Sequence, residues 1–424
     1  MRREAMEQAR QTGDVTAVVY ALTLTSTSNR GPERTQERLS ASAEVLELAS
    51  GSADTDSVMD VYSWHISDLL QNGDGKQARA AIELFQDQAE KTRQPFYSYV
   101  TQSFLSALDT AEGRFDASEQ RAQAAQAIGQ RLRGQDHSGV FAMRMFAIRK
   151  EQGRLQEVLP AVKIFLQNSS ANAAWTPGLA LIYSELDMET EARAEFESLA
   201  KDDFEAIPED GLTVLSLVYL AEVCAFLGDA DRAETLYQRL QPWDGQNVVV
   251  AGGVAYCGAA SRYLGLLATV MERWETSEEH FLAAVEMDRA MGARTWLSHT
   301  QHDYAKMLLA RDASGDREKA SSLIDHALQD CGESGMLSLQ TRLVGLKPDR
   351  VTPPIRNPNN PSGLTQREVD VIKLVATGMT DREVAGELLI SVGTVNTHVK
   401  NILNKTGTSN RTEAAAYAIQ SGLA

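Results

Sequence analysis

A turn that recurs at nearly regular intervals constrains the fold of this chain more than any other feature. The turn residues are Gly73, Gly113, Gly153, Asp187, Gly228, Glu272 and Gly315, at spacings of 40, 40, 34, 41, 44 and 43 residues. Each ends an apolar-periodic segment of helical length. A residue that is small in six of the seven cases follows five positions later: Ala78, Ser118, Val158, Ala192, Ala233, Ser277 and Ala320, of which Val158 is the largest. A left-handed turn followed by a small side chain lets two antiparallel helices cross closely. We therefore predict an all-α chain in which residues 1–348 stack helix pairs into an α-solenoid with an extended concave surface.

One copy of the pattern has a recognisable sequence. The segment LGDADRAETLYQRLQP (227–242) resembles the turn and second helix of a tetratricopeptide repeat, and the longer period here implies longer helices. Residues 245–311 resemble the helical-repeat region of large bacterial regulators of the STAND class, in which an NTPase domain precedes the repeats. The closest approach to a phosphate loop, GDGKQ at 73–77, lacks the first glycine and has Gln77 in place of the Ser or Thr that binds magnesium. We expect a repeat turn there and no NTP site.

Net charge, hydropathy and cysteine spacing limit the classes of protein to which this chain can belong. The net charge of −17 over 424 residues lies entirely on residues 1–363, because residues 364–424 contain equal numbers of acids and bases. No apolar run is long enough to span a bilayer, and we expect Val15 to Leu24 to be a helix of the fold, not a signal peptide. Cys224, Cys257 and Cys331 have no metal-ligand spacing, which predicts buried free thiols and a cytoplasmic location.

A proline-rich segment divides the chain. The sequence DRVTPPIRNPNNPSG (349–363) contains four prolines and three asparagines, which disfavour helix. We predict a linker at 349–361 between the repeat domain and a C-terminal domain at 362–424.

The C-terminal segment predicts four short helices. Thr365 with Glu368, Thr380 with Glu383, and Asn410 with Glu413 have the spacing of capping boxes, and Ser391 is a fourth N-cap. Gly378, Gly407 and Gly422 follow the helices that they end. The second and third helices are separated by only a few residues, as in a helix-turn-helix.

The third of these helices predicts contact with DNA. Val395, Val399 and Ile402 recur at i, i+4 and i+7 and form its buried face. The opposite face carries Asn396, Thr397, Lys400 and Asn404, whose polar groups can reach base edges in the major groove. The window from Leu388 to Thr412 contains Lys400, Lys405 and Arg411 and no acid, as a surface that faces phosphates requires.

The whole segment resembles the LuxR family of DNA-binding regulators. The matching elements are LTxRE from Leu364, ATG from Ala376, EVA from Glu383, IS…TV…H from Ile390, Asn401–Ile402 and NRTEA from Asn410. The resemblance implies a DNA-binding set of Thr394, Asn396, Thr397, His398, Lys400, Asn401, Asn404, Lys405 and Arg411, in which positions 396, 397 and 400 contact bases. It also implies pairing of two domains through Ala414, Ala415, Ala418 and Ile419, and hence a homodimer on an inverted-repeat operator. The chain departs from the family pattern at three positions. Position 396 is Asn where the family commonly has Lys or Arg, and positions 406 and 408 are Thr where the family usually has Leu and Val.

These observations favour a transcription regulator in which a repeat domain, bound by a protein, peptide or small-molecule effector, controls a DNA-binding domain. A helical-repeat interaction scaffold with a vestigial DNA-binding domain is the alternative, and a fragment of a cyclase- or ATPase-associated enzyme is a third interpretation. We predict no catalytic residue, cofactor, metal site or membrane contact. His299, His302 and Asp303 have a spacing that could bind a metal, but a structural or groove-lining role is favoured because no fourth ligand is near in sequence. The five tryptophans are expected to pack between helices.

Overall fold

The computed structural model describes two compact units, Met1–Lys347 and Pro348–Ala424. The residues whose placement it describes are 11, 15–27, 31–48, 55–132, 138–160, 162–163, 172–207, 210–250, 253–347, 364, 366–388, 392–408, 410–421 and 423. The predicted linker lies outside the described residues, as do Thr365, Ser391 and Gly422.

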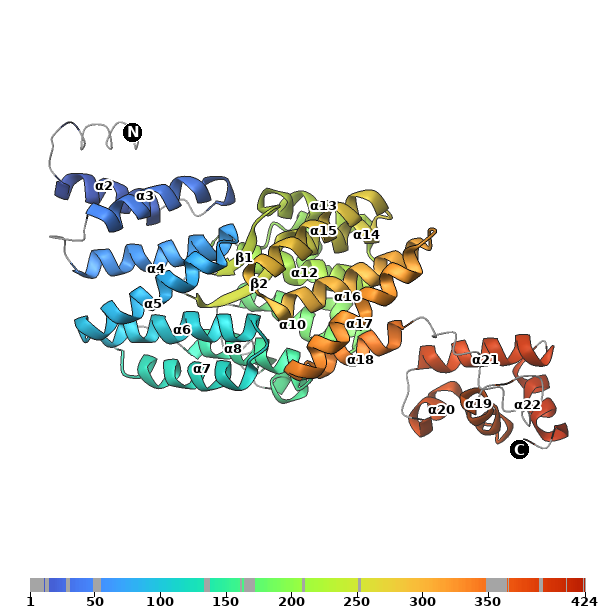
Figure 1. Ribbon diagram of the computed structural model, residues 1–424. Coiled ribbons are helices and arrows are strands. Elements are labelled where there is room, and N and C mark those ends of the chain that lie inside the picture. Colours follow the sequence, from blue (N-terminus) through green and yellow to red (C-terminus); the bar gives the residue numbers. More distant parts are fainter. Residues whose placement is uncertain are drawn as a thin grey trace. The chain divides into compact units, whose positions relative to one another are not determined.

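The first unit is built from antiparallel helix pairs, as predicted (Figure 1). The pairs are α2 (Val15–Thr27) with α3 (Thr35–Leu48), α4 (Thr55–Asn72) with α5 (Gly75–Thr92), α6 (Pro95–Ala111) with α7 (Phe115–Gly129), α10 (Asn172–Glu185) with α11 (Glu189–Ala200), α12 (Thr213–Leu227) with α13 (Ala230–Leu240), α14 (Ala260–Val270) with α15 (Trp274–Met291), and α16 (Arg294–Arg311) with α17 (Asp316–Ser334). The remaining elements are α8 (Ser138–Glu151), α18 (Leu337–Leu346) and the short 3-10 helices η1 (Pro32–Arg34), η3 (Leu155–Glu157), η4 (Lys201–Phe204) and η5 (Gln241–Trp243).

The backbone at the turns confirms the repeat. All seven predicted turn residues have positive φ, from 55° at Asp187 to 88° at Gly73 and Gly315. Six of the small residues that follow have no exposed surface, and the exception is Val158. Val158 follows the 3-10 helix η3, where a regular second helix does not form directly after the turn. The GDGKQ segment is the turn between α4 and α5, with Gly73 at φ 88°.

A β-hairpin interrupts the helical pattern and was not predicted. Strands β1 (Asn247–Val250) and β2 (Ala255–Ala259) pair antiparallel, with an irregular register between Asn247 and Val249. Figure 1 shows the hairpin between the α4–α6 helices and the α12–α16 helices. Contacts join β1 to α4 and α12, and β2 to α6, α14, α15 and α16. Pairing with β2 satisfies the backbone polar groups on one edge of β1.

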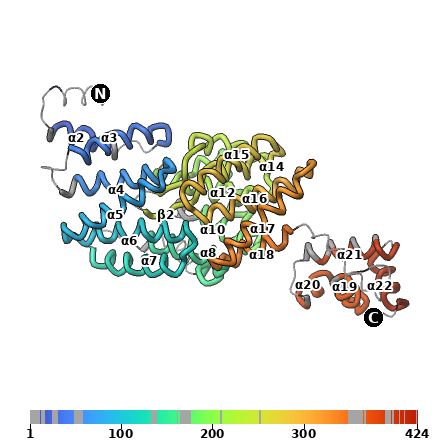
Figure 2. Tube along the Cα trace, in the orientation of Figure 1, coloured from blue at the N-terminus to red at the C-terminus, as the bar shows by residue number. Residues whose placement is uncertain are grey.

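The first repeats contact the last repeats, so the solenoid closes on itself. Helix α5 touches α15, α6 touches α16, and α8 touches α18; the Cα trace follows this return of the chain (Figure 2). The turn glycines lie at these contacts, because a Cβ on Gly73 would meet the Met287 sulfur at 2.4 Å and one on Gly113 would meet Ser334 at 2.4 Å. With the hairpin packed between the two sets of helices, the unit differs from the extended concave surface that we expected.

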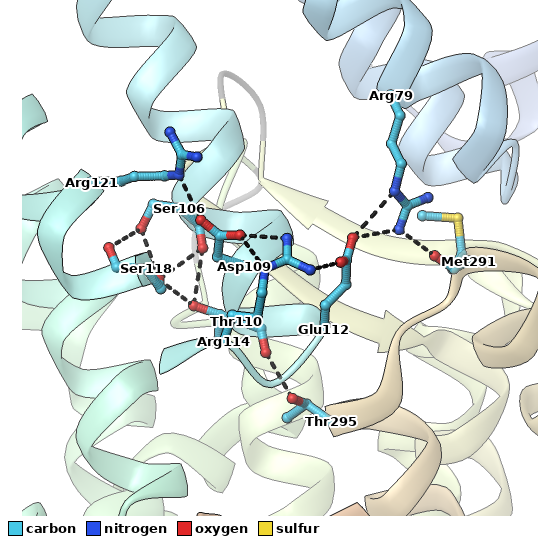
Figure 3. A network of polar contacts seen from close by, with 10 residues as sticks. All are labelled: Arg79, Ser106, Asp109, Thr110, Glu112, Arg114, Ser118, Arg121, Met291 and Thr295. Atoms are coloured by element: carbon cyan, nitrogen blue, oxygen red, sulfur yellow. Dashed lines mark hydrogen bonds and ion pairs between the residues drawn. The ribbon is translucent and has the colours of Figure 1, made fainter. Parts of the chain in front are cut away.

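A polar network crosses this contact (Figure 3). Arg79 on α5 donates to Glu112 at 2.7 Å and to the Met291 carbonyl at the end of α15 at 2.8 Å. The Thr295 hydroxyl on α16 donates to the Thr110 carbonyl on α6 at 2.7 Å. The bonds to the Met291 and Thr110 carbonyls join residues more than 180 positions apart in sequence.

Other expectations about the first unit are met within the described residues. Val15–Thr27 is helix α2, and all three cysteines are buried free thiols whose pKa burial raises to about 12. Trp64, Trp243, Trp274 and Trp296 are at least partly buried, and the Trp175 side chain lies outside the described residues. None of the helices in the described part of the chain has the length and apolar character that a membrane crossing requires.

Candidate nucleic-acid interface and repeat-domain cavity

Four helices form the second unit around a core of its own. They are α19 (Gln366–Ala376), α20 (Asp381–Leu388), α21 (Val392–Thr406) and α22 (Arg411–Gln420). Val395 and Ile402 of α21 are buried in this core and Val399 is half-buried against it, as the periodicity predicted. This core therefore fixes one face of α21 toward the interior of the domain.

Two of the predicted capping boxes form. The Thr380 backbone N–H donates to the Glu383 carboxylate at 2.7 Å, and the Glu383 N–H donates to the Thr380 hydroxyl at 3.4 Å. The hydrogen bonds from the Thr380 backbone and side chain lower the pKa of Glu383. At the start of α22, the Glu413 N–H donates to Asn410 Oδ1 at 3.0 Å. Gly378 and Gly407 have φ of 87° and 69° and end α19 and α21. These caps fix where α20 and α22 begin, and the two glycines fix where α19 and α21 end.

The predicted DNA-binding residues from Thr394 to Lys405 all lie on α21. The side chains of Thr394, Asn396, Thr397, Asn401 and Asn404 lie outside what the structure describes. His398 is half-buried. Lys400 is exposed, and no ion pair reaches it from the described residues. A cation in that position is available to a phosphate or a base.

Two other predicted DNA contacts already have partners within the domain. Lys405 Nζ lies 2.7 and 2.8 Å from the two carboxylate oxygens of Glu368, whose side chain is 3% exposed. Arg411 pairs with Asp381 and donates to the Met379 carbonyl at 2.5 Å. These bonds join α21 to α19 and α22 to α20, a structural role that the sequence did not indicate.

The predicted dimerisation stripe is split between two faces of α22. Ala414 and Ala418 are 2% and 0% exposed and belong to the core of their own domain. Ala415 is half-buried and Ile419 is 61% exposed. Of the four predicted residues, only Ala415 and Ile419 are therefore positioned to meet another molecule, because helix α22 turns the other two inward.

Comparison with known families agrees with this geometry. Residues 362–418 match the family described as bacterial regulatory proteins, luxR family. This segment is a LuxR-type helix-turn-helix domain. The chain is 38% identical over 84 residues to the transcriptional regulatory protein LiaR of Bacillus subtilis, and these residues are 20% of this chain and 40% of LiaR. It is 43% identical over 60 residues to the response regulator protein VraR of Staphylococcus aureus strain Mu3, which is 14% of this chain and 29% of VraR. The chain thus spans less than half the length of these relatives.

Two solved structures align with the chain at low sequence identity and low TM-score. One is a Rap protein complexed with competence and sporulation factor, with a TM-score of 0.39, 10% identity, and coverage of 78% of this chain and 97% of that one. Another is the APC/C hetero-tetramer Cut9–Hcn1, with a TM-score of 0.30, 9% identity, and coverage of 98% and 95%.

The repeat unit contains a charged cavity that sequence reasoning did not find. Its volume is about 630 Å³, and its walls come from α8, η3, α10, α12, α14, α16 and α18. Lys150 Nζ lies 2.8 Å from Glu222 and 3.4 Å from Glu185. Arg262 lies 2.8 Å from Glu222 and 2.7 Å from Asp303. Burial opposes ionisation of Glu222, but Lys150 and Arg262 hold its pKa below the usual range.

The same cavity is lined by His299 and His302, the two histidines that sequence analysis considered as possible metal ligands. His302 Nδ1 lies 2.7 Å from Asp303, and His299 Nε2 lies 2.8 Å from Glu151. Burial lowers the pKa of His302. Among the described residues, no cluster of three or more His, Cys, Asp or Glu is arranged to hold a metal ion. His299, His302 and Asp303 line the cavity, which agrees with the groove-lining role that we favoured.

Proposed function

We propose that this protein is a transcription regulator whose helical-repeat unit controls DNA binding by the LuxR-type domain. The match of residues 362–418 to the luxR family carries the proposal. In it, α21 enters the major groove, with Asn396, Thr397 and Lys400 toward bases and Thr394, His398, Asn401 and Asn404 near them. Lys405 and Arg411 contribute positive charge near the phosphates while they remain tied to the domain.

Dimerisation on DNA is the second part of the proposal. Ile419 and Ala415 form a small apolar surface on α22, and such a surface gives weak pairing that DNA would reinforce. The expected operator is an inverted repeat. Protection of a single half-site by a monomer in footprinting would contradict this.

Control by the repeat unit follows from charge. The whole net charge of −17 lies on residues 1–363, and an acidic body joined to a DNA-binding domain opposes approach to phosphates. An effector with a basic patch, or one that turns the repeat unit away, would relieve this restraint.

The contact of α21 with DNA is tested by substitution. DNA captured genome-wide with the intact chain supplies the operator. Lys400→Ala should weaken DNA binding. If Lys400 contacts a phosphate, the slope of the logarithm of the binding constant against the logarithm of the salt concentration should fall in magnitude by about one. Asn396→Ala should lose about 1–3 kcal/mol of base discrimination. Lys373→Ala, an exposed lysine on α19, is the matched control. If the Lys400 and Asn396 variants bind like the parent, α21 does not occupy the groove.

A salt series tests control by the repeat unit. The fragment 350–424 should bind the operator at least as tightly as the intact chain at low salt, and the difference should shrink as salt rises. Weaker binding by the fragment at every salt concentration would instead mean that the repeats promote dimerisation. An intact chain that captures no specific DNA would favour the scaffold alternative.

A further inference from the structure

Two residues of α16 bring polar groups without a partner to the charged cavity of about 630 Å³. His302 and Lys306 both line it, and residues four apart lie on the same face of a helix. Lys306 is exposed, and neither an ion pair nor a hydrogen bond reaches its side chain from the described residues. Its ammonium group is therefore available to an anion that enters the cavity.

The second ring nitrogen of His302 is a hydrogen-bond acceptor. Its Nδ1 lies 2.7 Å from Asp303 Oδ1. Burial opposes ionisation of Asp303, but Arg262 and His302 hold the pKa of this carboxyl below its usual range, while burial lowers the pKa of His302. The neutral ring therefore donates from Nδ1 to the ionised carboxylate, and Nε2 keeps its lone pair. Nε2 has no partner among the described residues, and it is not one of the polar atoms that are closed to solvent.

Most of the acids in the cavity wall are already neutralised. The ion pairs, at 2.7 to 3.4 Å, join Asp303 to Arg262, Glu222 to Lys150 and Arg262, and Glu185 to Lys150 and Arg342. Asp187, which also lines the cavity, is exposed in the turn after α10. Because the buried carboxylates are paired, they repel an anion beside Lys306 less than unpaired carboxylates would.

Apolar side chains form another part of the wall. They include Leu181, Phe226, Leu266 and Leu337, and Leu337 is 57% exposed. The volume lies within the range of pockets that hold small organic ligands, which commonly combine an apolar wall with a few polar groups that orient the ligand.

We propose that this cavity binds a small organic acid that has a hydrogen-bond donor beside its carboxylate and an apolar side chain. The carboxylate accepts from Lys306, the neighbouring hydroxyl or N–H donates to His302 Nε2, and the side chain lies against the apolar wall. A ligand without the donor leaves the Nε2 lone pair unsatisfied, and one without the charge loses a charge-assisted bond. 2-Hydroxy acids and N-acylated amino acids share this chemistry.

The cavity also reaches α18, the last helix of the first unit. Leu337, Thr341 and Arg342 of α18 line it, α18 ends at Leu346, and the first unit ends at Lys347. A ligand there contacts the helix that leads toward the DNA-binding unit in the sequence. Its use as the effector rests on the proposed control of DNA binding, whereas its binding does not.

Binding is measured by calorimetry on the full chain, with sodium phenyllactate and analogues that each lack one feature. 3-Phenylpropionate lacks the hydroxyl, phenyllactamide lacks the charge, and lactate lacks the apolar side chain. Each should bind about tenfold more weakly than phenyllactate. N-acetylphenylalanine has an amide N–H in place of the hydroxyl, so tighter binding of this acid would assign the donor to an amide and keep the site. Equal affinities of phenyllactate and 3-phenylpropionate, or no binding of either donor-bearing acid, would overturn the proposal.

Variants assign the binding to the cavity. Lys306→Met should weaken phenyllactate binding about tenfold and leave phenyllactamide binding unchanged. His302→Asn keeps an N–H for Asp303 and removes Nε2, so phenyllactate and 3-phenylpropionate should then bind equally. Lys76→Met, an exposed lysine on α5 outside the cavity, is the matched control and should bind like the parent. Because Lys306 is exposed, its variant should fold, and unchanged binding by it would refute the site even if the His302 variant did not fold.

The effector role is tested separately from the site. Operator affinity of the full chain is measured with and without saturating phenyllactate. An acid that binds without changing operator affinity would keep the site and refute its use in control. A chain that captures no specific DNA would refute the proposed function and leave the calorimetric result standing.

Discussion

Asp288 on α15 gives the repeat unit a pH dependence that one substitution should remove. Its side chain is fully buried, its Oδ2 accepts from the Thr300 hydroxyl at 2.7 Å, and its Oδ1 has no partner. Burial raises the pKa of this carboxyl to about 7. Because the folded pKa lies above the unfolded one, stability is fully present below about pH 4 and is lost as pH rises toward 7.

The size of the effect follows from the shift. A displacement of about three pKa units corresponds to about 4 kcal/mol, of which about 2–3 kcal/mol is lost between pH 5 and pH 8. Asp288→Asn keeps the shape and removes the charge, so its stability advantage over the parent should widen by that amount across this range. In thermal melts of the full chain, the difference in Tm should grow by about 3 °C.

Comparing the two proteins at each pH cancels the other titrating groups. Asp87→Asn on the exposed side of α5 is the matched control and should follow the parent. Parallel pH profiles for the parent and Asp288→Asn, or a lower Tm for the variant at pH 8, would refute the reasoning.

Four further substitutions test a helix cap, the packing of the hairpin and the Lys405–Glu368 ion pair. Thr380→Ala should cost the DNA-binding unit about 1 kcal/mol in denaturant unfolding, because it removes the cap of α20. Gly253→Ala should destabilise the repeat unit strongly, because the added Cβ would lie 2.6 Å from the Phe104 backbone nitrogen. Gly228→Ala should cost only about 1 kcal/mol, because no atom lies within 4 Å of its added Cβ and only the left-handed backbone is strained. Equal losses in these two glycine variants would contradict the close packing of the hairpin on α6. Glu368→Gln should lower the Tm of the DNA-binding unit, because it removes the charge that pairs with Lys405. The released Lys405 should make the DNA affinity fall more steeply with salt concentration. An unchanged salt slope would mean that Lys405 does not approach phosphate.

The repeat was predictable because its signal is local. Asp187 and Glu272 are not glycines, yet spacing alone placed them at turns, and both have a left-handed backbone with φ of 55° and 56°. Val158 was the one large residue at a crossing position, and the helix pairing is irregular there. The capping boxes at Thr380 and Asn410 were predictable for the same reason, since both partners lie within one turn of helix.

The hairpin and the buried polar groups could not be predicted in this way. The run from Asn247 to Val250 is too short to distinguish a strand from a buried helix by its period, and its strand conformation depends on α4 and α12, which pack against it. Lys150 and Glu222 meet at 2.8 Å although 72 residues separate them. The charged cavity lined by Lys150, Glu222 and Arg262 likewise depends on residues from several helices, none of which is a motif alone.

The closure of the solenoid has a consequence for how the chain unfolds and how it tolerates truncation. In an open repeat array each unit touches only its neighbours, so repeats can fray from either end and terminal deletions are tolerated. Here α5, α6 and α8 are covered by α15, α16 and α18, so removing α15 to α18 would uncover these three helices. The repeat unit should therefore melt in one cooperative step, and a chain that ends before residue 274 should not fold stably. Contacts across some two hundred residues also raise the contact order, so folding should be slower than in an open array of the same length.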